Sequence, residues 1–273
     1  MAEKLFLLGR PGSGKSTVRR YITKIAQHEI WSPYPISDTK ILQDMCAADR
    51  EHIHIRPTEC GGFEVLDFSI LDNALKIIEG RVEKALERHE LDRPRIAIIE
   101  FARRDYVQAL SQFAPSFLKD AHFLILESDV DTCMERIYER TKFPMFDDDT
   151  NVPANIMTGY YQADPTHETV RQLQETLRLN SHQIQLMRTD GPRDECLYDC
   201  IRPFARTLMM PDSQSRRITG PLVHSHISST KFYNNHCPSP LNGMQVEEAN
   251  EVEQVKEQLA VTFEKELVGS ASS

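Results

Sequence analysis

Short apolar segments alternate with longer segments of helical periodicity over roughly the first 210 residues of the chain. Short apolar runs bounded by polar or turn-forming residues are typical of strands covered on both faces, as in parallel sheets. Five such segments predict strands: 5–8, 31–37, 95–101, 122–127 and 184–187. The second of them contains prolines and is supported mainly by its apolar approach to Asp38.

The segments between these runs predict amphipathic helices. In residues 71–89 the apolar side chains recur at spacings of three and four: Leu71, Leu75, Ile78, Val82 and Leu86. Further helices are predicted at 17–28, 39–48, 129–141, 167–181 and 194–209. This alternation predicts an α/β fold with a five-stranded, mostly parallel sheet and helices on both faces.

The composition changes near Pro211, which places a domain boundary there. Residues 1–210 form the predicted domain, and residues 211–244, rich in Ser, Asn, His and Pro, predict a loosely ordered linker. Residues 245–273 predict an acidic amphipathic helix and tail as a C-terminal extension. Three roles are open for this helix: packing on the domain, contact with a second copy or a protein partner, or only marginal helicity.

Charge and composition exclude several classes of protein. Charged residues at 27% and hydrophobic residues at 40% are ordinary for a globular protein. No apolar stretch approaches the roughly 18 residues that a membrane span needs, and the N-terminus does not resemble a secretory signal. The net charge of −9 argues against an extended nucleic-acid surface. We therefore expect a cytoplasmic protein with neither membrane nor nucleic acid as a partner, and its six cysteines as free thiols.

The segment after the first predicted strand carries the clearest chemistry. It fills every fixed position of the pattern GxxxxGK[ST]: Gly9, Arg10, Pro11, Gly12, Ser13, Gly14, Lys15 and Ser16. Such a loop points backbone N–H groups at a polyphosphate, and Thr17 begins a helix whose N-terminal dipole favours the same anion. Lys15 adds a positive charge and Ser16 a hydroxyl for Mg²⁺. The pattern predicts the P-loop NTPase fold with ATP and Mg²⁺ as cofactors. GTP is less favoured because no Asn-Lys-x-Asp tetrapeptide occurs.

Two carboxylates end predicted strands and so belong to the same sheet edge as this loop. Glu100 follows the apolar run 96–99, where it could hold a water on Mg²⁺ or accept a substrate proton, and a capping or solvated role is the alternative. Asp38 ends the strand 31–37, and two roles are open for it: catalytic base, or N-cap of the helix that begins at Thr39. Arg103 follows Glu100 and could offset charge on a transferred phosphoryl group.

From Lys4 to Met209 the chain resembles the P-loop kinases of nucleotides, nucleosides and other small metabolites, which include adenylate kinase, gluconate kinase and zeta toxins. Residues 127–140 are similar to the passage into the adenylate kinase lid, where two arginines lie at the spacing of Arg136 and Arg140. The resemblance implies base stacking for Arg136 and phosphate contact for Arg140. A solvated helix face is the alternative for this pair.

The chain departs from these kinases in two places. Residues 143–149 are acidic where those kinases often have arginine, which leaves Arg171 as a candidate late lid arginine. No acceptor signature is evident between Asp38 and Phe68. The acceptor is therefore less well defined than the phosphoryl donor.

Together these features predict an ATP-binding phosphotransferase that acts on a small-molecule acceptor such as a nucleoside, a nucleotide or a similar metabolite. Its predicted catalytic residues are Lys15, Asp38, Glu100 and Arg140. The alternative is an ATP-hydrolysing P-loop switch with a protein partner, since kinases and switches share the same loop.

Overall fold

A computed structural model describes residues 2–58, 62–87, 93–146, 149–161, 167–190 and 195–209. These residues belong to the first of the two units into which the chain divides, residues 1–218. The predicted linker at 211–244 and the predicted acidic helix and tail at 245–273 lie outside the described residues.

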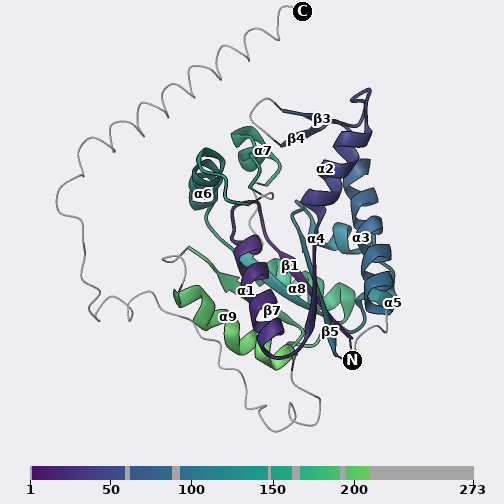
Figure 1. Cartoon of the computed structure of the whole chain (residues 1–273), viewed down its shortest axis with the longest axis vertical. Helices are drawn as coiled ribbons and strands as arrows, with labels where there is room; N and C mark the ends of the chain where they lie inside the picture. Colours follow the sequence, from purple (N-terminus) through teal and green to yellow (C-terminus); the bar gives the residue numbers. More distant parts are fainter. Residues whose placement is uncertain are drawn as a thin grey trace, which may run out of the picture. The chain divides into compact units, whose positions relative to one another are not determined.

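The centre of the fold is a five-stranded sheet (Figure 1). Its strands are β1 (Ala2–Leu8), β2 (Ser32–Ser37), β5 (Arg95–Phe101), β6 (Ala121–Glu127) and β7 (Ile184–Arg188). They lie in the order β2-β5-β1-β6-β7, and all four pairings between neighbours are parallel. The predicted five-stranded sheet is confirmed, including the proline-containing strand β2 at its edge.

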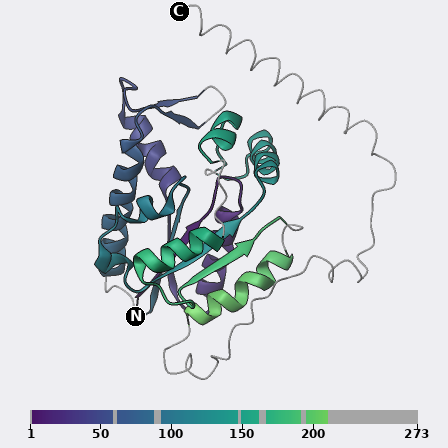
Figure 2. The same ribbon diagram turned by 180° about the vertical axis from the view of Figure 1, so that it is seen from behind.

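Helices cover both faces of the sheet because successive side chains of each strand point to opposite sides. Phe6 and Leu8 of β1 belong to one core cluster, whereas Leu5 and Leu7 belong to the other. The first cluster is covered by α2 (Asp38–Ala48), α3 (Ser69–Glu87), α4 (Tyr106–Leu110), α5 (Pro115–Leu118) and α8 (His167–Leu177). The second is covered by α1 (Lys15–His28) and α9 (Glu195–Leu208). Figure 2 shows α8 in teal and α9 in green on either side of β7.

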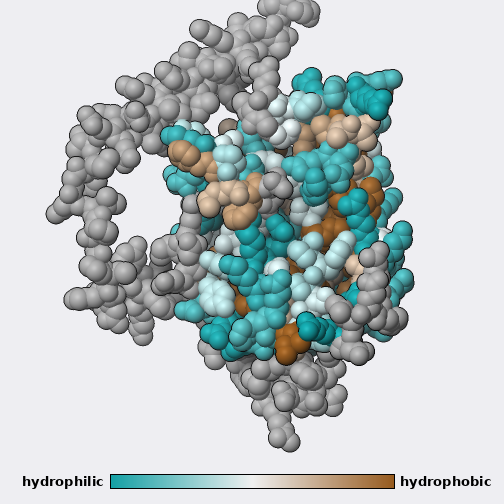
Figure 3. Space-filling view, viewed as in Figure 1, coloured by the Kyte–Doolittle hydropathy of each residue, from teal (hydrophilic) through white to brown (hydrophobic). Residues whose placement is uncertain are grey.

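Two further helices, α6 (Val130–Lys142) and α7 (Ala154–Gly159), pack on one another around a small cluster of Cys133, Ile137 and Met157. The helices predicted from periodicity are confirmed, with ends that differ by a few residues from the prediction. Hydrophilic side chains cover most of the described surface on the face shown in Figure 3, and apolar ones gather in smaller patches. Within the described part of the chain, no helix has the length and apolar character needed to cross a membrane. Cys46 and Cys133 are free thiols, as predicted.

The sequence did not predict a small antiparallel hairpin of β3 (Ile55–Pro57) and β4 (Phe63–Val65). Each strand has only three residues, so no alternating pattern marks it. The hairpin begins at a local cap: the Asp49 carboxylate accepts hydrogen bonds from the backbone N–H groups of residues 53–55. These bonds lower the pKa of Asp49 because they favour its charged form.

A partly buried histidine near the start of β6, His122, makes stability depend on pH. Burial lowers the pKa of His122 to about 4, and repulsion from His182 acts in the same direction, while Asp120 opposes it. Glu3 also faces the ring, with its carboxylate 3.9 Å from Nδ1. Since an unfolded histidine titrates near 6.5, the unfolded chain takes up the proton first as the pH falls.

We therefore expect stability to fall between pH 6.5 and 4, by up to about 3 kcal/mol from this group. The replacement His122→Gln should remove this pH-dependent part of the free energy of unfolding, and urea unfolding at several pH values would measure the change. The difference between the two proteins at pH 7.5, where the ring is neutral in both states, gives the packing contribution. A difference that stays constant down to pH 4 would contradict the assignment.

Candidate functional site

The predicted phosphate loop joins the end of β1 to the start of α1. Residues 9–14 form the connection, and Lys15, Ser16 and Thr17 lie in the first turn of α1. Gly14 is the N-cap of this helix at φ +91°, and no side chain caps the helix. The uncapped N-terminus of a helix, with its N–H groups and dipole, suits an anion. The described residues thus have a P-loop α/β fold.

Glycine is required in this loop for two different reasons. At Gly12, where φ is +80°, an added Cβ would lie 2.8 Å from the Cα of Cys133 in α6 and in still closer contact with its carbonyl oxygen. At Gly14 the space around an added Cβ is open, so only the positive φ opposes a side chain. Close packing against α6 therefore fixes the middle of the loop, and backbone conformation fixes its end.

Lys15 is 6% exposed and folds back over the loop. Its Nζ donates a hydrogen bond of 2.8 Å to the carbonyl oxygen of Arg10. Burial lowers the pKa of Lys15, whereas the nearby carboxylates of Glu100 and Asp38 act to raise it and the charge of Arg140 acts to lower it. An ammonium group carries three donors, so a phosphate oxygen can be bound while the loop contact is kept. The structure thus brings all four predicted catalytic residues into one electrostatic environment.

Glu100 contacts the first turns of α1. Ser16 Oγ donates to its Oε1 at 2.9 Å, and Arg19 Nε donates to its Oε2 at 2.8 Å. The residue is 7% exposed and lies at the end of β5, opposite Leu7 of β1. The ion pair between Arg19 and Glu100 was not predicted. The signal for it was the spacing of three residues between Ser16 and Arg19, which places these two side chains on one face of a helix.

Ser16 and Glu100 fit the magnesium ion that a P-loop fold implies. A hydroxyl and a carboxylate at hydrogen-bond distance offer hard oxygen ligands, and Mg²⁺ typically takes one or two protein ligands with water and phosphate for the rest. Among the described residues, no group of three or more His, Cys, Asp or Glu side chains could hold a metal by itself. The phosphates of a bound nucleotide would therefore have to complete the coordination.

Asp38 is the first residue of α2, and the N-cap is Ser37. The capping role that the sequence left open for Asp38 is therefore wrong. Its Oδ2 lies 2.5 Å from Nη1 of Arg103, and both residues are 6% exposed. The guanidinium also donates to the carbonyl oxygens of Ala102 and Leu71. Burial acts to lower the pKa of Arg103, but attraction and a hydrogen bond to Asp38, together with Tyr161 and Tyr160, raise it on balance. The two side chains thus form a buried ion pair.

The two arginines of α6 do not lie on a solvated helix face. Arg136 Nη1 lies 3.4 Å from the carbonyl oxygen of Gly12, and Nη2 donates to the carbonyl oxygen of Thr189. Arg140 Nη2 donates to Thr150 O at 2.9 Å, and its charge lowers the pKa of Lys15. Base stacking by Arg136 and phosphate contact by Arg140 remain predictions. In this structure, Arg136 contacts the backbone of the phosphate loop.

Arg171, the candidate late lid arginine, lies on the exposed surface of α8. It forms ion pairs with Glu168 and Glu175 of the same helix, at 2.7 and 3.0 Å. The described part of the segment after α6 presents apolar side chains instead: Phe143 is 70% and Met145 79% exposed.

Two residues that brace the phosphate loop were not identified from the sequence. Tyr106 Oη accepts a hydrogen bond of 2.8 Å from the N–H of Gly9, and Thr189 Oγ1 donates one of 2.8 Å to the carbonyl oxygen of Ser13. Burial raises the pKa of Tyr106, so its hydroxyl stays protonated. Thr189 directly follows β7, so its position at the edge of the sheet where the phosphate loop lies could have identified it from the sequence. Nothing in the sequence around Tyr106 marks it.

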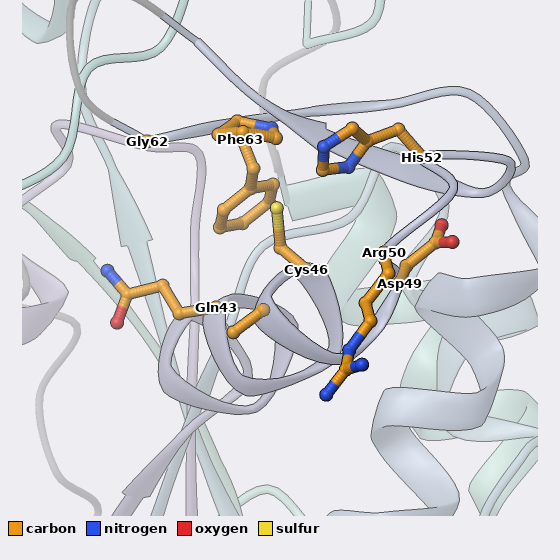
Figure 4. A pocket seen from close by; sticks show the side chains of 9 residues that line it. Gln43, Cys46, Asp49, Arg50, His52, Gly62 and Phe63 are labelled. Atoms are coloured by element: carbon orange, nitrogen blue, oxygen red, sulfur yellow. The ribbon is translucent and has the colours of Figure 1, made fainter.

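A cavity of about 490 Å³ opens between the second half of α2 and the β3–β4 hairpin (Figure 4). In Figure 4 the side chains of Cys46 and Phe63 lie close together, with His52, Asp49 and Arg50 at the other end. None of the predicted site residues lines this cavity.

Comparison with known proteins gives matches among solved structures. No protein-family model matches the chain, and no curated protein matches its sequence. Solved structures similar to it include a candidate kinase from Chloroflexus aurantiacus, with 14% identity, a TM-score of 0.47 and coverage of 77% of this chain and 99% of that one. A gluconokinase from Sinorhizobium meliloti has 14% identity, a TM-score of 0.40 and coverage of 76% and 91%. A shikimate kinase from Acinetobacter baumannii has 10% identity, a TM-score of 0.37 and coverage of 77% and 92%.

The two loop glycines provide a matched pair of variants. Gly12→Ala should lower the free energy of unfolding by about 2–5 kcal/mol, because it adds a clash with Cys133 to the cost of a positive φ. Gly14→Ala should cost only about 1–2 kcal/mol, from the backbone term alone. Urea unfolding midpoints measure both. Equal losses in the two variants would show that α6 does not pack on the loop as described.

Proposed function

We propose that the chain is an ATP-dependent kinase that transfers the γ-phosphoryl group of ATP to a hydroxyl of a small-molecule acceptor. The observation that carries this proposal is the environment of Lys15, where charges from three other elements converge: Asp38 from α2, Glu100 from β5 and Arg140 from α6. A phosphate loop alone would serve any nucleotide-binding protein. A second buried carboxylate beside it, apart from Glu100, provides a group that can act on an acceptor.

Each residue has a distinct role in this proposal. The N–H groups of the loop and Lys15 would bind the β- and γ-phosphates, and Ser16 and Glu100 would hold Mg²⁺. The metal, when bound, neutralises charge on the phosphates. Arg140 offsets charge on the group being transferred. Phosphoryl transfer depends mostly on such positioning and charge compensation.

Asp38 is the carboxylate that we assign to the acceptor. Both carboxylate oxygens of Glu100 accept hydrogen bonds, Oε1 from Ser16 and Oε2 from Arg19. In Asp38, the oxygen that contacts Arg103 is Oδ2, and we assign Oδ1 to the acceptor. Asp38 accepts the acceptor's hydroxyl proton as the new oxygen–phosphorus bond forms and the bond to the β-phosphate oxygen breaks, which releases ADP. Arg103 holds the carboxylate in place through its hydrogen bond to Oδ2.

Replacement of the loop lysine tests the donor half of the proposal. Lys15→Ala should reduce kcat about 10²- to 10³-fold, the usual loss when one preorganised donor to a developing charge is removed. The fold should persist, since the ammonium makes one hydrogen bond within its own loop. Turnover is measured as acceptor-dependent ADP release, and circular dichroism checks the fold. Retained turnover would overturn the mechanism.

The Asp38–Arg103 pair tests the acceptor half and separates catalysis from folding. Asp38→Asn should reduce kcat about 10²-fold or more. It should also destabilise the fold, by about 3–5 kcal/mol, because Arg103 is left as an uncompensated buried charge. The double variant Asp38→Asn with Arg103→Gln should recover stability without activity. Recovery of both would mean that the pair has only a structural role.

Acceptor dependence also separates this proposal from the hydrolysing switch. A kinase consumes ATP faster when its acceptor is added. A steady rate that no metabolite changes but a protein partner alters would favour the switch.

A further inference from the structure

Three aromatic side chains gather beside the Asp38–Arg103 pair. We call Phe68, Tyr160 and Tyr161 the aromatic cluster. Phe68, just before α3, stacks on Tyr160 with ring centroids 5.4 Å apart, and Tyr160 meets Tyr161 edge to face at 4.7 Å. The Tyr161 hydroxyl lies 3.4 Å from the carbonyl oxygen of Ala102, the residue before Arg103.

The cluster and the phosphate loop are linked through Asp38. Arg103 Nη1 donates hydrogen bonds both to Asp38 Oδ2 and to the carbonyl oxygen of Ala102. That same carbonyl oxygen accepts a hydrogen bond from the hydroxyl of Tyr161. Asp38 also acts on Lys15 of the phosphate loop, where its charge opposes the lowering of the lysine pKa by burial. An acceptor whose hydroxyl meets Asp38 would therefore extend from the phosphates toward the aromatic cluster.

Phe68 and Tyr160 of this cluster are more exposed than side chains of a hydrophobic core. Phe68 is 54% exposed, and Tyr160 is only partly buried. Exposed aromatic faces grouped at a site provide flat apolar surface on which a planar ring can stack. The contact between Phe68 and Tyr160 would also anchor the short helix α7. The experiments below therefore separate a binding role of these two side chains from a purely structural role.

The end of the site beside Arg103 favours an uncharged acceptor, because Lys15 and Arg140 are assigned to the phosphates of the donor. The guanidinium of Arg103 is committed to Asp38 and to the carbonyl oxygens of Ala102 and Leu71. A carboxylate or phosphate on the acceptor would meet Asp38 beside a cation that is already neutralised. Like charges brought together without a partner are unfavourable in a buried site.

We infer that the acceptor is an uncharged molecule of the nucleoside class, which places its sugar hydroxyl at Asp38 and its flat base against the aromatic cluster. This inference rests on the proposed kinase function.

A panel of acceptors tests it with the intact chain and Mg²⁺–ATP. Adenosine and cytidine should accelerate ADP release at least tenfold more than their 5′-monophosphates, gluconate or ribitol at equal concentration. Highest turnover with gluconate, ribitol or a monophosphate would overturn the inference and leave the kinase in place. If no compound on the panel accelerates ADP release although a nonhydrolysable ATP analogue binds, the kinase proposal fails with it.

Variants of the aromatic cluster test the location. Phe68→Ala and Tyr160→Ala should each raise KM for the accepted nucleoside about 10-fold or more, since stacking on an aromatic side chain contributes strongly to binding of a base. Tyr160→Phe should behave like the unchanged protein. The dissociation constant of the ATP analogue should not change in any of them.

Phe143→Ala is the matched control, because this aromatic side chain is also exposed, at 70%, but lies after α6. It should leave KM unchanged. A lower Tm in Phe68→Ala and Tyr160→Ala with an unchanged KM would show that the cluster only anchors α7, and would overturn the inference.

Discussion

Five parallel strands end at one edge of the sheet, and this arrangement brings together groups that lie far apart in the sequence. β1 leads into the phosphate loop, β2 ends beside Asp38, and β5 carries Glu100 near its end. A parallel sheet needs a crossover after each strand, so each strand end is followed by a turn into a helix. The side chains at these turns can meet only at the edge where a phosphate would lie.

The loop itself depends on neighbours that hold it from two sides. Cys133 of α6 leaves no room for a side chain at Gly12, while Tyr106 and Thr189 each make one hydrogen bond to its backbone. Buried backbone groups that lose such a partner cost about 1–3 kcal/mol. A loop held in this way needs little reordering when a polyphosphate binds, and a preorganised site is what phosphoryl transfer requires.

Features that depend on local pattern could be predicted from the sequence, and features that depend on packing could not. The sheet followed from apolar runs, and the loop followed from eight consecutive residues. Asp38 was placed at the right edge, but its ion pair with Arg103 joins residues 65 positions apart. The hairpin was missed because three-residue strands have no period, and Tyr106 was missed because nothing near it in the chain distinguishes it from core. The aromatic cluster combines residues from two loops and has no signature in one sequence.

The ion pair between Arg19 and Glu100 affects the order in which ligands arrive. Glu100 already faces one cation, and Lys15 adds a second positive charge to the same region. A lone divalent ion therefore gains little there, since like charges repel it in a poorly solvated environment. A polyphosphate brings the negative charge that reverses this balance. In the proposed kinase, metal and nucleotide would thus enter as one complex.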